Sequence, residues 1–80
     1  MTNRDDLVGT LQGQIASVGL TNTTEKVVKV ALLAGVTKMV ITGKPKYDVV
    51  KWLNRQNQTL GWDVKVVVSE VYSVIKDVDF

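Results

Sequence analysis

Two short segments rich in β-branched residues set the strongest constraint on what this chain can fold into. Residues 36–42 form a run of mostly β-branched and apolar side chains that ends at Gly43, and residues 62–68 place valines on both sides of an extended chain. A short run of such residues bounded by glycine is typical of a β-strand. We therefore expect a strand in each segment, the second of them buried on both faces.

Three further segments have the apolar spacing of helices. Residues 4–18 place five apolar side chains on one arc of a helix: Leu7, Val8, Leu11, Ile15 and Val18. Residues 24–34 end at Gly35, which we expect to cap a second helix, and residues 46–60 follow Pro45 and form a third. The final segment, residues 69–78, fits helical spacing as well as strand alternation; we favour a helix there, and the strand stays open.

The order of these elements predicts a small two-layer α/β domain that spans residues 1–80 as a single unit. The order is α-α-β-α-β plus a C-terminal helix or strand, and it contains one β-α-β unit, whose connection should be right-handed. A sheet of two parallel strands is marginal, so a third strand must come from the C-terminal segment or from a second copy of the chain. We therefore expect a homodimer.

A helix-turn-helix motif is an alternative fold for the middle of the chain. Four residues stand at spacings that such motifs favour: Ala31, Gly35, Val36 and Ile41. A recognition helix that started near Thr37 would, however, meet Gly43 and Pro45 within two turns. The strand is therefore the preferred prediction for this segment.

The predicted order of elements over residues 24–68 resembles that of two groups of small α/β nucleic-acid-binding proteins. These are the Alba chromatin proteins and the kink-turn-binding ribosomal proteins. The resemblance rests on a helix that ends in Gly35, the strand at residues 36–42, another helix and a valine-rich strand. It implies an α/β fold only, because no functional motif of either group can be placed on this sequence.

The chain contains no histidine and no cysteine, which removes the usual groups of acid-base, thiol and zinc enzymes. Its carboxylates all have structural explanations, at helix starts, at a strand start or near the C-terminal end. We therefore expect no enzymatic activity, no cofactor and no metal site. The missing cysteines and an acidic start without a signal-peptide pattern predict a cytoplasmic protein. The most apolar stretch, residues 27–41, is too short and too charged to cross a membrane.

The charges are unevenly distributed along the chain. The net charge is +2, but residues 26–65 hold eight Lys or Arg and only two Asp, whereas both flanking segments are acidic. Cations near aromatic rings are typical of surfaces that bind RNA or DNA. The candidate nucleic-acid-binding residues lie in the Gly-Pro loop and on one face of the third helix: Lys44, Lys46, Tyr47, Lys51 and Arg55. An ordinary turn and a solvated helix face are the alternative explanations.

A protein-protein interaction module, such as an inhibitor or accessory subunit, is the second functional hypothesis. It would present Leu33, Trp52 or Trp62 to a partner, because large apolar and aromatic side chains anchor such interfaces. Leu33 falls on the narrow polar face of the predicted second helix, so it is either covered by another element or part of an interface. Both tryptophans could instead be partial core residues.

Overall fold

The computed structural model describes residues 3–18, 24–59 and 65–80, with the side chains of Asn3 and Thr59 excepted. It consists of four helices, α1 (Asn3–Val18), α2 (Thr24–Ile41), α3 (Lys46–Thr59) and α4 (Lys65–Ile75). None of the described residues forms a strand, so the predicted α/β class is wrong and the fold is all-α. The helices predicted at residues 4–18 and 46–60 are confirmed as α1 and α3, the latter up to Thr59, because residue 60 lies outside the described residues.

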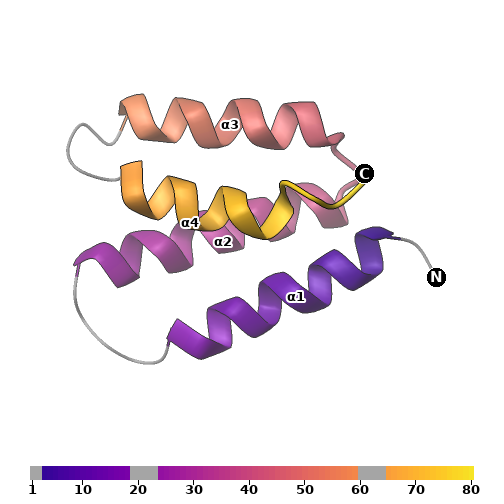
Figure 1. Cartoon of the computed structure of the whole chain (residues 1–80), viewed down its shortest axis with the longest axis horizontal. Coiled ribbons are helices and arrows are strands. Elements are labelled where there is room, and N and C mark those ends of the chain that lie inside the picture. The colour runs from indigo at the N-terminus through magenta and orange to yellow at the C-terminus, as the bar shows by residue number, and fades with distance from the viewer. Residues whose placement is uncertain (1–2, 19–23, 60–64) are drawn as a thin grey trace.

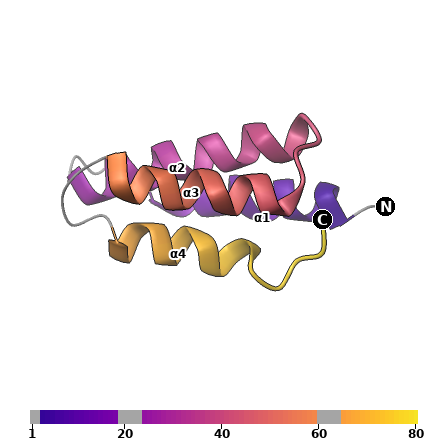
Figure 2. The same cartoon turned by 90° about the horizontal axis from the view of Figure 1, so that it is seen from above.

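Successive helices run in alternating directions, and in Figure 1 both α2 and α4 lie between α1 and α3. Figure 2 shows that α2 and α4 lie on opposite sides of the bundle. Helix α1 packs on α2 and α4, and α3 packs on the same two helices from its own side. The outer helices α1 and α3 do not pack against each other. Each of them therefore keeps a broad face that no other described element covers.

Each of the four helices contributes side chains to one aliphatic core. Its fully or almost fully buried members are Leu7, Leu11, Leu32, Leu33, Val36, Val40, Val49, Leu53, Val67, Val68, Val71 and Ile75. Burying a side chain of this size contributes roughly 1.5 to 3 kcal/mol relative to leaving it exposed. The core is therefore the main source of stability and fixes the outer faces of the helices.

The strand predicted at residues 36–42 is instead the last part of α2. Val36 and Val40 lie one helical turn apart and are both buried, as is Thr37 between them. The Thr37 hydroxyl donates a hydrogen bond of 2.7 Å to the Leu33 carbonyl, which satisfies this polar group inside the core. β-branched residues cost less than about 0.7 kcal/mol each in a helix, so burial on the neighbouring helices outweighs their strand preference.

Gly35 does not end the second helix, because α2 continues through it. A Cβ atom at this position would lie only 2.8 Å from Cζ2 and 3.2 Å from Cζ3 of Trp52, a residue of α3. The glycine therefore lets an indole ring rest on the backbone of α2. The helix-turn-helix alternative is also wrong, because α2 has no turn between Ala31 and Ile41.

Helix α2 ends at Ile41, two residues before Gly43. Gly43 has φ +84°, and its N–H donates to the carbonyl of Val40 at 3.1 Å while that of Lys44 donates to Met39 at 2.9 Å. These two bonds form a Schellman motif, in which a left-handed residue, usually glycine, closes the helix. Pro45 then precedes α3, so this loop joins two helices rather than a strand and a helix.

The second predicted strand is also wrong where the structure describes it. Residues 65–68 form the first turn of α4, and residues 62–64 lie outside the described residues. Val67, Val71 and Ile75 are buried at helical spacing, and the helix favoured for the C-terminal segment is confirmed up to Ile75. Since no strand occurs in residues 3–18, 24–59 or 65–80, the described part of the chain contains no β-α-β unit. The resemblance to the two α/β groups therefore has no basis. The expectation of a dimer in which a second copy supplies a third strand has none either.

Candidate nucleic-acid interface

The outer face of α3 is a continuous polar surface. It consists of Tyr47, Lys51, Asn54, Arg55 and Gln58, which fall on one face of the helix and are all exposed. Tyr47 is the most exposed of the large apolar and aromatic side chains that the structure describes, with 74% of its surface open to solvent. Among the described side chains of α3 the one carboxylate, Asp48, is half-buried, so the exposed charges of this helix are positive.

A shallow hollow lies beside this face. It has a volume of about 220 Å³ and is lined by Asp48, Lys51, Trp52 and Arg55. Trp52 is half-buried, because its ring packs over Gly35 of α2. The hollow thus brings an aromatic edge and two cations together, while Asp48 reduces the positive potential at one end.

Lys46 is not part of this face. Its ammonium group donates hydrogen bonds to the carbonyls of Lys76 at 2.6 Å and of Val78 at 2.9 Å, just beyond the end of α4. A cation is stabilised there because the last carbonyls of a helix carry partial negative charge. Lys46 therefore holds the tail after α4, and Lys44 remains as the exposed cation of the loop.

Arg4 makes further contacts with the loop before α3 and with the residues after α4. Its Nη1 atom donates to the carbonyls of Val40 at 3.3 Å and Lys44 at 2.8 Å, at the end of α2. Its guanidinium lies 5.4 Å from the centre of the Phe80 ring, within range of a cation-π interaction. We call Arg4, Lys46 and residues 76–80 the clasp. A cation in the first turn of a helix is disfavoured by the helix dipole, and these contacts compensate for that position. Nothing in the local sequence indicated them.

Replacing Lys46 by methionine should lower the free energy of unfolding by about 1 kcal/mol, because two hydrogen bonds and a favourable charge are lost. Urea unfolding measures the change. Lys44→Met is the matched control and should have almost no effect, since only its backbone carbonyl takes part in the clasp. Equal effects of the two substitutions would contradict the assignment of Lys46.

The residues proposed to anchor a protein partner lie in three different settings. Leu33 has no exposed surface and belongs to the core, so it cannot reach a partner in the folded chain. Trp52 is half-buried against Gly35. Trp62 lies outside the described residues. No shared surface of these three residues is therefore formed in the part of the chain that the structure describes.

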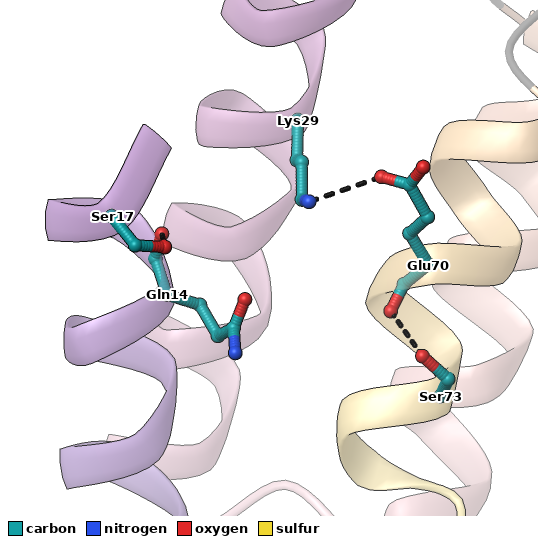
Figure 3. A network of polar contacts seen from close by, with 5 residues as sticks. All are labelled: Gln14, Ser17, Lys29, Glu70 and Ser73. Carbon is teal, nitrogen blue, oxygen red and sulfur yellow. Dashed lines mark hydrogen bonds and ion pairs between the residues drawn. The ribbon is translucent and has the colours of Figure 1, made fainter. Parts of the chain in front are cut away.

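A second hollow, of about 460 Å³, lies between the end of α1, the start of α2 and α4. It is lined by Ser17, Val18, Glu25, Lys26, Lys29 and Glu70. The ammonium of Lys29 and the carboxylate of Glu70 are 3.0 Å apart and form an ion pair across it (Figure 3). Its charges are balanced, so it has no preference for an anion.

Two other kinds of site are absent from residues 3–18, 24–59 and 65–80. No group of three His, Cys, Asp or Glu residues there could hold a metal ion. No helix among these residues is both long enough and apolar enough to span a bilayer.

Comparison of the chain with protein-family models, with curated proteins and with solved structures gives no significant match.

Proposed function

We propose that this chain is a non-enzymatic nucleic-acid-binding protein that contacts RNA or DNA through the outer face of α3. The observation that supports this most directly is the pair of exposed cations, Lys51 and Arg55, on a face without an exposed carboxylate. Tyr47 lies on one side of this pair and Trp52 on the other. We also place the protein in the cytoplasm, a reducing compartment that suits a chain without cysteine.

The side chains of this face match the chemistry of a nucleic acid. Lys51 and Arg55 can neutralise phosphates, and the amides of Asn54 and Gln58 can donate to phosphate or sugar oxygens. The exposed ring of Tyr47 can stack on an unpaired base. With about two phosphates neutralised, the logarithm of the affinity should fall with the logarithm of salt with a slope near −2, as expected of modest binding.

The double substitution Lys51→Glu and Arg55→Glu should reduce binding at least tenfold at low salt, because it replaces both phosphate contacts by repulsion. Fluorescence anisotropy with labelled single-stranded and duplex oligonucleotides measures the change. The Lys26→Glu and Lys65→Glu variant is the matched control. It changes the net charge by the same amount at exposed positions outside α3.

The control should keep most of the binding. Equal losses in both double variants would show that net charge alone drives association, and an unmodified chain that binds neither oligonucleotide at low salt would refute the proposal.

A further inference from the structure

The face of α2 that points away from the core carries an exposed apolar seam. Its members are Val27, Ala31, Ala34, Lys38 and Ile41, spaced alternately by four and three residues, and all are exposed. Val27 keeps 57% and Ile41 63% of its surface open to solvent. Alternation of four and three is the spacing with which two helices pack along their length. We call these five residues the α2 seam.

Helix α2 has more apolar surface than its own chain covers. Helices α1, α3 and α4 bury only the opposite side, with Leu32, Leu33, Val36 and Val40. A helix that is apolar around most of its circumference is normally covered on more than one side. The α2 seam is therefore an apolar helix face that none of the other described helices covers.

We propose that the α2 seam packs antiparallel against the same seam of a second copy, with the two-fold axis at Ala34. A two-fold interface must be self-complementary, because the same patch serves both subunits. The side chains of the seam are complementary in size to those of the same seam in the opposite direction. The small Ala34 side chains meet at the axis and allow close approach, while the larger Ile41 of each copy meets Val27 of the other.

The charge of Lys38 selects the antiparallel direction. In a parallel pair the two Lys38 ammonium groups would lie directly against each other. In the antiparallel pair they are eight residues apart along the seam, about 12 Å at 1.5 Å per residue, which exceeds the Debye length of about 8 Å at physiological salt. Each Lys38 stem then lies over the small Ala31 of the other copy with its charge in water.

A hollow at the end of the seam supports this register independently. It has a volume of about 320 Å³ and is lined by Arg4, Asp5, Val8, Val40, Ile41 and Gly43. Because Val27 of the second copy would face Ile41, it would lie over this hollow, whose inner wall includes Val8 and Val40. The two-fold axis produces two such contacts, one at each end of the seam.

The expected dimer is weak. Helix α2 has 18 residues, so the seam is at most about 27 Å long. One helix from each copy gives an interface in the small class, below about 1,200 Å² in total, which is typical of reversible association. We therefore expect a monomer-dimer equilibrium that shifts with dilution over the micromolar range.

Sedimentation equilibrium of the full chain over a range of concentrations tests the proposal. Ala34→Glu should weaken the dimer at least tenfold, because it places two carboxylates against each other at the axis. Ala16→Glu, the same change at an exposed position of α1, is the matched control and should leave the equilibrium unchanged. Mixing Ala34→Glu with Ala34→Lys should restore association by pairing opposite charges.

Cross-linking tests the direction of packing. The chain has no cysteine, so single cysteines can be introduced at will. With a short bismaleimide reagent, a mixture of Val27→Cys and Ile41→Cys chains should cross-link in the antiparallel pair, whereas Val27→Cys alone should not. A chain that stays monomeric at all concentrations, a dimer that survives Ala34→Glu, or Val27→Cys chains that cross-link to themselves would each overturn the proposal.

Discussion

Replacing Leu33 by alanine should lower the free energy of unfolding by about 2 to 5 kcal/mol. Leu33 has no exposed surface and lies among the aliphatic residues of the core, so the substitution removes buried contacts and leaves a cavity. Thermal or urea unfolding followed by circular dichroism measures the change. This experiment distinguishes a core residue from an interface residue, the two roles that the sequence left open.

Val66→Ala is the control for this experiment. Val66 is 56% exposed on α4, so its truncation removes little packing and should change the stability by no more than about 0.5 kcal/mol. If Leu33→Ala were as mild as Val66→Ala, Leu33 would not be in the core, and the packing of α2 would have to be revised.

The substitution Gly35→Ala should destabilise the protein by about 1 to 3 kcal/mol, although alanine favours a helix by up to about 1 kcal/mol over glycine. The reason is steric, because the added methyl group would collide with the ring of Trp52. Gly13→Ala, within α1, is the matched control. A methyl group there meets no atom within 4 Å, so this variant should gain about 0.5 to 1 kcal/mol.

A double-mutant cycle isolates the cause of this difference in sign. In a Trp52→Ala background the collision is absent, so Gly35→Ala should become stabilising, as Gly13→Ala is. If Gly35→Ala were already stabilising in the unmodified chain, the indole ring would not rest on α2.

The sequence predicted α1 and α3 because their polar and apolar residues lie on separate faces, which leaves no ambiguity about the period. The strands predicted around Val36 and Val67 were wrong because a short run of β-branched and apolar residues satisfies a strand and a buried helix equally. The helical signal was nevertheless present. Leu32, Leu33, Val36 and Val40 continue one apolar face straight through Gly35. Taking that glycine as a cap concealed it.

The candidate site was predictable where exposure alone decides it. Tyr47, Lys51 and Arg55 follow from the position of the apolar face of α3, and the structure exposes all three. Lys46 was not predictable in the same way, because its hydrogen-bond acceptors lie about 30 residues further along the chain. Local spacing contains no information about such partners.

The clasp couples parts of the chain that would otherwise fray separately. The first and last residues of a domain usually open locally, each at its own rate and at little cost. Here Arg4 joins the start of α1 to the end of α2 and to Phe80, while Lys46 joins the start of α3 to the same tail. Opening at one end therefore removes contacts at the other. Slow hydrogen exchange at the Gly43 and Lys44 amides would report on both ends at once.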